Sequence, residues 1–112
     1  MKFLVAIHHR DDYDAFAEDD KQMMLDIDKL NDEMEAAGAR LFAGGLHRFN
    51  KAKSIRINPT GKVIVTDGPY LETKEHIGGF WILECANMDE AQEWGSKATI
   101  ACKAPVEVRQ FH

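Results

Sequence analysis

Runs of apolar residues, some continuous and some alternating with polar ones, predict six strands. Residues 3–8 form a run rich in β-branched and aromatic side chains that is long enough for a buried strand, and residues 54–58 and 106–111 alternate. The full pattern places strands at residues 3–8, 40–47, 54–58, 62–66, 80–85 and 106–111. Gly44-Gly45 lies inside the second strand, which indicates a bulge or the close approach of another group.

Two segments carry the apolar period of an amphipathic helix. Between residues 15 and 37 apolar residues recur at steps of three, four and seven, and Gly38 suits the C-terminal cap of this helix. Met23 and Met34 on the apolar stripe suit either core packing or a soft-metal or cofactor stripe, and the period favours core packing. Asn87, three residues before Glu90, predicts the start of a second helix over residues 88–98.

The order of these elements favours one α+β domain over residues 1–112. We predict a ferredoxin-like antiparallel sheet with both helices on one face and an added hairpin in the middle. The other face of the sheet would then be uncovered, and we expect Trp81, Leu83 and Phe111 to contribute to it. Because an uncovered apolar sheet face is normally an interface, the pattern predicts a homodimer whose sheets pack face to face.

Composition narrows the class of protein. The chain has 112 residues, 45% of them hydrophobic and 29% charged, and a net charge of −5, which are values of a globular domain. The basic residues form no long run, so we expect no nucleic-acid partner. Cys85 and Cys102 have no metal-ligand spacing and predict free thiols in a reducing compartment. The apolar N-terminal run is too short for a signal peptide or a membrane span, which predicts a cytoplasmic protein without a membrane partner.

The segment between the strands at 62–66 and 80–85 is unusually long for a hairpin connection. It spans thirteen residues from Asp67 to Gly79, where two to five are common. Asp67 either starts the turn that Gly68 and Pro69 continue, or also orients a histidine or acts as a base. Glu72 either belongs to a solvated, salt-bridged surface or presents its carboxylate into a cleft.

This segment carries a family signature. Residues 67–75 read Asp-Gly-Pro-Tyr-Leu-Glu-Thr-Lys-Glu, and Gly-Phe-Trp follows at residues 79–81. The stretch resembles the signature of YCII-related proteins of the DGPF type, and the likeness covers roughly residues 36–112. The resemblance implies a dimeric α+β barrel but no defined activity. Proteins of this type are mostly uncharacterised, some occur beside or fused to sigma factors, and a His/Asp-based enzymatic role has only been suggested.

Five polar residues are the candidates for a site. His47 matches the family pattern and, as a neutral imidazole near pH 7, suits the transfer of a proton, although a structural, hydrogen-bonded histidine fits the position as well. We predict that His47 and Asp67 are the catalytic pair, with Asp67 orienting the imidazole. His8, Glu72 and Arg109 are the predicted substrate-binding residues, and the guanidinium of Arg109 would hold an anionic group.

No motif in the sequence indicates a cofactor. A metal site needs three or more converging ligands, and His8, His47 and Asp67 would form one only if three strand ends met. The sequence has no Walker loop, dinucleotide fingerprint, zinc spacing or Ser/Cys nucleophile motif, so we expect neither cofactor nor metal. Two hypotheses remain. The first is a homodimer with a small-molecule pocket in each subunit that works as a cofactor-independent enzyme. The second is a non-catalytic regulatory or protein-interaction module that works beside a transcription (sigma) factor.

Overall fold

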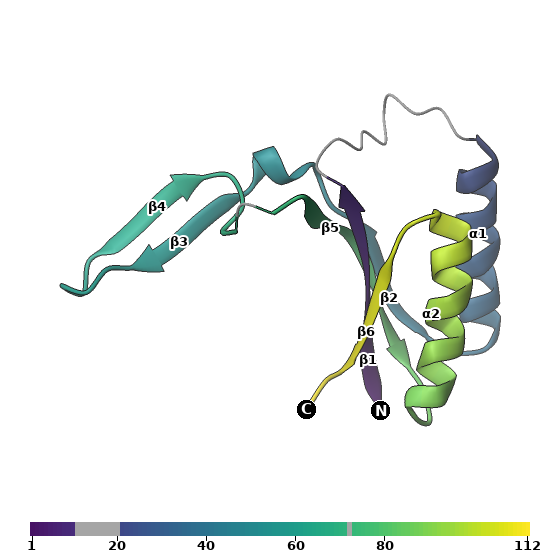
Figure 1. Ribbon diagram of the computed structural model, residues 1–112. Coiled ribbons are helices and arrows are strands. Elements are labelled where there is room, and N and C mark those ends of the chain that lie inside the picture. The colour runs from purple at the N-terminus through teal and green to yellow at the C-terminus, as the bar shows by residue number, and fades with distance from the viewer. Residues whose placement is uncertain (11–20, 72) are drawn as a thin grey trace.

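The computed structural model describes residues 1–10, 21–71 and 73–112 of the chain (Figure 1). Its elements are β1 (Lys2–Arg10), α1 (Lys21–Ala36), β2 (Arg40–Gly45), the 3-10 helix η1 (Phe49–Lys51), β3 (Lys53–Ile57), β4 (Val63–Asp67), β5 (Glu75–Glu84), α2 (Met88–Cys102) and β6 (Val106–Gln110). The six predicted strands and the second helix are thereby confirmed. The first helix is confirmed from residue 21 onwards, since the predicted start at residue 15 lies outside the described residues.

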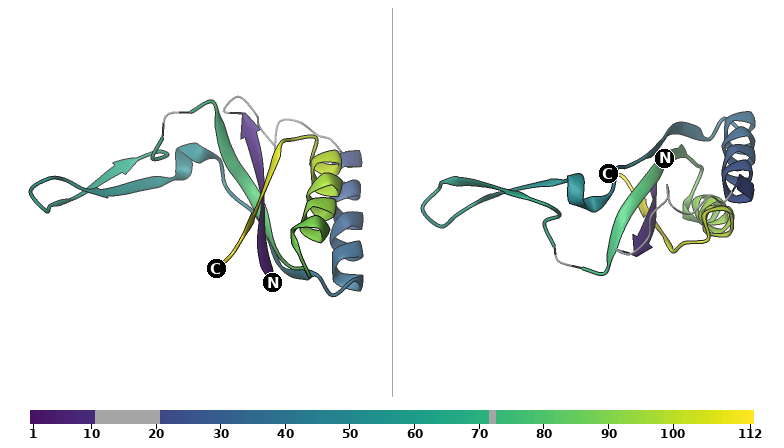
Figure 2. Two further views of the ribbon diagram at one scale, coloured as in Figure 1. Left: turned by 60° about the horizontal axis from the view of Figure 1, so that its bottom comes forward. Right: turned by 90° about the horizontal axis from the view of Figure 1, so that it is seen from above.

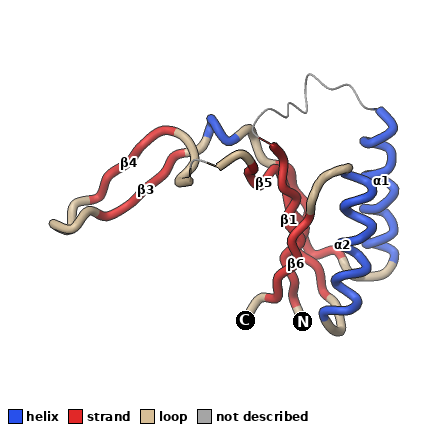
Figure 3. The backbone as a smooth tube through the Cα atoms, in the orientation of Figure 1, coloured by secondary structure: helices blue, strands red, loops and turns tan. Residues whose placement is uncertain are grey.

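Four strands form one antiparallel sheet in the order β2-β5-β1-β6. Both helices cover the same face of this sheet, as Figures 1 and 3 show. β3 and β4 pair only with each other and form a separate two-stranded sheet. The α+β class with antiparallel strands is therefore confirmed, and the strand order fits the ferredoxin-like arrangement. Among the described residues, no helix is long and apolar enough to cross a membrane.

The ends of both helices follow the predicted capping chemistry. At the end of α1, Gly38 has a φ of +69°, and the backbone N–H of Ala39 donates to the carbonyl of Met34 at 2.9 Å. Such a bond closes the last helical turn and needs a residue that tolerates the left-handed region. At the start of α2, the Asn87 side chain accepts from the backbone N–H of Glu90 at 2.9 Å. Local sequence therefore decides where these helix ends lie.

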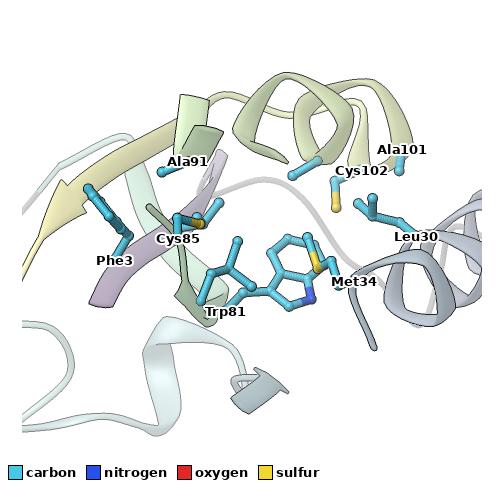
Figure 4. Packing of buried hydrophobic residues seen from close by; sticks show 11 residues of the cluster. Phe3, Leu30, Met34, Trp81, Cys85, Ala91, Ala101 and Cys102 are labelled. Carbon is cyan, nitrogen blue, oxygen red and sulfur yellow. The ribbon is translucent and has the colours of Figure 1, made fainter. Parts of the chain in front are cut away.

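The hydrophobic core lies between the four-stranded sheet and the helices (Figure 4). β1 and β5 supply its sheet side, where Val5 pairs with Trp81 and Phe3 with Leu83. The helices supply the opposite side of the core, with Leu30, Met34, Ala91, Ala98, Ala101 and Cys102. Trp81 is 3% exposed, and its indole N–H donates to Oδ1 of Asn31 on α1 at 2.8 Å. That bond satisfies the one polar group of the largest core side chain.

The predicted face of Trp81 and Leu83 was wrong. Both side chains point to the helices, and Leu83 is fully buried. Alternation shows that two such residues share a face, but it does not say which face the helices cover, and a shift of one residue exchanges the two. The face without helices, called the open face below, carries a different apolar set on the same strands: Leu4, Ala6, Phe42, Phe80 and Ile82.

Two glycine pairs bring β2 and β5 unusually close. A Cβ on Gly79 would lie 2.9 Å from the carbonyl oxygen of Gly44 and 3.3 Å from the Cα of Gly45. Real Cβ atoms do not approach backbone so closely, so this crossing requires glycine. The prediction that Gly44-Gly45 marks a close approach is confirmed.

β3 and β4 project from the body of the molecule as a hairpin, which we call the arm (residues 52–68). The arm and the helices lie on opposite sides of the four-stranded sheet in both views of Figure 2. The projection raises the radius of gyration to 16.0 Å, against about 13 Å for a compact domain of this length. The connection after the arm is shorter than predicted, because β5 begins at Glu75 and not at Phe80. Residues 75–79 therefore belong to the sheet.

Candidate functional site

Several histidines meet at one end of the four-stranded sheet. β1 ends with His8 and His9, and the register of β1 on β5 makes His9 the partner of His76. The chain leaves β2 at the same end, where the N–H of Leu46 donates to the carbonyl of Gly78 at 2.8 Å, and His47 follows directly. We call this region the histidine end. It is also the end from which the arm departs (Figure 3).

A bulge shapes the histidine end. The register of β1 on β5 shifts between Ile7 and His8, so that Ile7 pairs with Gly79 and His8 with Ile77. Gly78 is the extra residue of this bulge, and the His9 ring lies directly against it. A Cβ on Gly78 would come within 1.9 Å of Cδ2 of His9. Bulges often re-aim side chains beside functional sites, and here the bulge leaves room for an imidazole.

Aromatic and cationic side chains border the same end. The ring of Phe49 stacks on His76 with a centroid distance of 4.2 Å and an interplanar angle of 13°. The guanidinium carbon of Arg48 lies 5.5 Å from the centroid of Phe49. Arg10 ends β1 and pairs with Glu75 in the register of the sheet. The histidine end thus combines proton-transfer groups with an aromatic surface and positive charge.

The pKa of His9 is lowered from its ordinary value. Burial is the larger cause and the charge of neighbouring His8 the smaller one, and both disfavour the imidazolium form. A histidine with a lowered pKa is neutral at pH 7 and can accept a proton there. The histidine end therefore contains a group with the charge state of a general base.

The two cysteines are poor nucleophiles. Cys85 and Cys102 are buried free thiols, as predicted from their spacing. Burial raises the pKa of Cys102 to about 11 and is also the largest cause of the raised pKa of Cys85. Because the thiolate is the reactive form, thiol chemistry at neutral pH is disfavoured at both positions. Within residues 1–10, 21–71 and 73–112, no group of three or more His, Cys, Asp or Glu side chains could hold a metal ion.

The predicted site residues are only partly brought together. His8 and His47 lie at the histidine end. Asp67 lies at the base of the arm, is well exposed, and pairs with the ammonium of Lys53. Its neighbour Gly68 has a φ of +93° and donates its N–H to the carbonyl of Ala52 at 2.8 Å. The corner that begins at Asp67 thus closes the base of the arm.

Arg109 and Glu72 do not join this group. Arg109 pairs with Leu4 in the sheet, four residues along β1 from His8, which is about 13 Å at the rise of a strand. Its guanidinium forms an exposed ion pair with Glu107. Glu72 lies outside the described residues. The arginines nearest the histidines in the fold are Arg10 and Arg48, which the sequence did not single out.

Sequence reasoning missed His9, His76 and Phe49 as members of one region. The partnership of His9 with His76 depends on the register and the bulge, and neither has a signal in the local sequence. The one signal that pointed there is the pair of double glycines at residues 44–45 and 78–79. Two strands that each carry two adjacent glycines are candidates for a close crossing.

Comparisons with known proteins identify the family of this chain. A protein-family model described as "YCII-related domain" matches residues 1–111 of the chain. An uncharacterised protein from Rhizobium meliloti (strain 1021) is 34% identical over 77 residues, which are 69% of this chain. The aligned part is 61% of that relative's length, so the chain spans less than two thirds of it.

Proposed function

Because the chain belongs to the YCII-related domain family, we propose that it is a homodimer that binds a small anionic molecule at the histidine end of each subunit. The observation that carries the proposal is that His9 and His76 are partners on neighbouring strands and that the His76 ring stacks on Phe49, with His8 and His47 at the same end of the sheet. Histidines are the side chains that best exchange protons near pH 7, and an aromatic ring offers a flat contact for a ligand. Arg10 and Arg48 add the positive charge that favours an anion.

The chemistry that suits this region is proton transfer without a cofactor. His9 accepts the proton, since its lowered pKa keeps it neutral at pH 7. His47 is exposed at the same end and remains the second candidate for proton transfer. The ion-pair partner of Asp67 in the structure is Lys53 and not His47. The contacts at the histidine end favour His9 for proton transfer over the predicted His47–Asp67 pair.

The homodimer part of the proposal rests on the open face. Its apolar side chains include Phe42 and Phe80, whose ring centroids are 5.7 Å apart, and Phe42 is 51% exposed. An apolar sheet face without a covering layer is normally an interface. Two copies packed through their open faces would close into the dimeric α+β barrel that the family resemblance implies.

A thermal-shift screen tests ligand binding. A panel of small mono- and dicarboxylic acids is added to the wild-type protein, and a bound acid stabilises the fold by about 2.7 kcal/mol when its concentration is 100 times Kd. His9→Asn keeps a small polar side chain but removes the titrating ring, and His47→Ala removes the second candidate. We expect both variants to lose the stabilisation. His112→Ala, at the far end of the chain, is the matched control and should respond like wild type.

Two results would contradict the proposal. The first is that no acid of the panel stabilises the wild-type protein. The second is that a stabilising acid acts equally on His9→Asn and His47→Ala, which would locate its site elsewhere. If ligands have no effect but the protein captures a transcription factor, the interaction-module hypothesis is favoured. The exposed apolar side chains Met24 on α1 and Ile100 on α2 are where a partner would then bind the helical face.

A further inference from the structure

The arm presents one row of apolar side chains to the surface. In the register of β3 on β4, Ile55 pairs with Val65 and Ile57 with Val63, so all four side chains point to the same face of the arm. They are 58–69% exposed. A two-stranded hairpin by itself is at best marginally stable in water. The apolar row is therefore a surface that needs a cover.

The opposite face of the arm has two contacts with its own chain. Ser54 is 4% exposed, and its hydroxyl donates to the carbonyl of Gly68 at 2.6 Å. The guanidinium carbon of Arg56 lies 5.8 Å from the ring centroid of Tyr70. The segment after β4 thus folds back on this side, while the apolar row on the other side stays exposed.

The charge of the arm is complementary to the rest of the molecule. The arm, residues 52–68, holds three Lys and Arg residues and one Asp, a net charge of +2. The remainder of the chain holds eleven cations against eighteen anions and is acidic. The basic side chains of this stretch are not consecutive, which is why no run is visible in the sequence. A positive arm is attracted to the negative body of another copy.

The shape of the molecule favours the same partner. The arm lies on the side of the sheet that the helices leave open (Figure 2). A second copy seated on the open face would occupy the space beside the arm. Two-fold symmetry would then place the arm of the second copy against the first, so that the contact is made twice.

From these observations we infer that each arm docks its apolar row, Ile55, Ile57, Val63 and Val65, on the acidic body of a second copy, and that two arms clasp the dimer. This inference rests on the homodimer proposed above and adds to it a contact surface outside the four-stranded sheet. Nucleic acid is a poorer occupant. Its phosphates would meet the lysines of the arm but would leave the apolar row exposed.

Analytical ultracentrifugation measures the contribution of the arm. Wild type, Ile57→Glu/Val63→Glu and the control Met24→Glu/Ile100→Glu are compared from about 1 to 200 µM. The control introduces the same substitutions at exposed apolar positions on the helices. We expect wild type and control to dimerise alike. The arm variant should dimerise about 100-fold more weakly or not at all, because the glutamates would be buried without partners.

An intermolecular label locates the docked arm. A nitroxide label is attached to the new thiol of Thr60→Cys, at the tip of the arm. Cys85 and Cys102 are buried, so the label reacts selectively with the exposed thiol. An equimolar mixture of spin-labelled protein and isotopically labelled wild type is examined by NMR. We expect the nitroxide to broaden amide signals in the body of the isotopically labelled copy. Sedimentation of the labelled protein as wild type controls for damage by the label.

Four outcomes overturn the clasp, and they distinguish its failure from the failure of the proposed homodimer. Equal dimerisation of wild type and Ile57→Glu/Val63→Glu, or a dimer without intermolecular broadening, leaves the homodimer standing but removes the arm from it. A wild-type monomer over the whole concentration range removes both. Binding of a short fluorescent DNA duplex by a monomeric wild type, lost in the arm variant, assigns the arm to nucleic acid. Ligand stabilisation in the thermal-shift screen is independent of all four.

Discussion

The body and the arm of this protein both have strands with large apolar side chains, but these strands have different surroundings. Trp81 in β5 is 3% exposed because helices cover its face of the sheet, whereas Ile57 in β3 is 69% exposed because that face of the arm has no second layer. Residues 80–83 of β5 form a continuous apolar run and residues 53–57 of β3 alternate, and either pattern predicts a strand. Burial depends on whether another layer packs on the strand, which neither pattern encodes.

The largest expected effect is in the body. Trp81→Ala should lower the free energy of unfolding by about 3–5 kcal/mol, since it leaves a cavity and removes the partner of Asn31. Ile57→Ala in the arm should change the unfolding of the monomeric body by less than about 0.5 kcal/mol. Urea unfolding followed by far-UV circular dichroism measures both. Similar losses in the two variants would show that the arm is part of the core.

The next effect concerns the bulge at the histidine end. Gly78→Ala should lower the free energy of unfolding by about 1–3 kcal/mol, because the new Cβ would overlap the His9 ring. In the double variant with His9→Ala, most of this loss should disappear, since the overlapping atoms are gone. The double-mutant cycle is measured by the same urea titration. Additive losses would mean that His9 does not occupy the space at Gly78.

A smaller effect should appear with pH. The pKa of His9 is lower in the folded chain than in the unfolded chain, mainly through burial, so the unfolded chain takes up a proton first as the pH falls. Stability from this residue is complete above pH 6.5, the ordinary pKa of histidine. It declines as the pH falls below that value, until the folded chain is protonated as well. Unfolding free energies from pH 8 to 5 should therefore decline less in His9→Asn than in wild type. Parallel curves would contradict the lowered pKa.

The smallest effect is expected at the base of the arm. Asp67→Asn should leave the free energy of unfolding within about 0.5 kcal/mol of wild type, because its ion pair with Lys53 is solvent-exposed. The backbone bond from Gly68 to Ala52 remains to close the corner. Lys53→Met should have a similarly small effect. If Asp67→Asn abolishes ligand stabilisation while the fold is unchanged, Asp67 takes part in the site after all.

Local chemistry made the helix ends and the strands predictable. Gly38 and Asn87 act within their own turns, so no knowledge of the rest of the fold was needed to assign them. Gly44-Gly45 likewise indicated a bulge or a close approach, since only glycine permits backbones to approach so closely. These are features in which neighbours in the sequence decide the outcome.

Local sequence did not predict which face of the sheet the helices cover or which residues lie together in the site. Trp81 was assigned to the wrong face because either face of an alternating strand can meet the helices. His9 and His76 are 67 positions apart in the sequence and meet through a register that includes a bulge. Asp67 looked like an orienting residue in the sequence, but its partner Lys53 comes from the adjacent strand of the arm. Each of these depends on pairing between distant segments.

The backbone bond between Ala52 and Gly68 has a consequence for how the arm can vary. The N–H of Gly68 and the carbonyl of Ala52 are 2.8 Å apart, so the bond holds the two ends of the arm together. The pairing of β2 with β5 then does not depend on the residues between Ala52 and Gly68. The arm can therefore open, be cut or change length without altering the register of the four-stranded sheet. Limited proteolysis at its tip and replacement of the whole arm by a short turn are modifications that the body can tolerate. In evolutionary terms the arm is an independent module, which selection can lengthen, shorten or remove while the histidine end keeps its geometry.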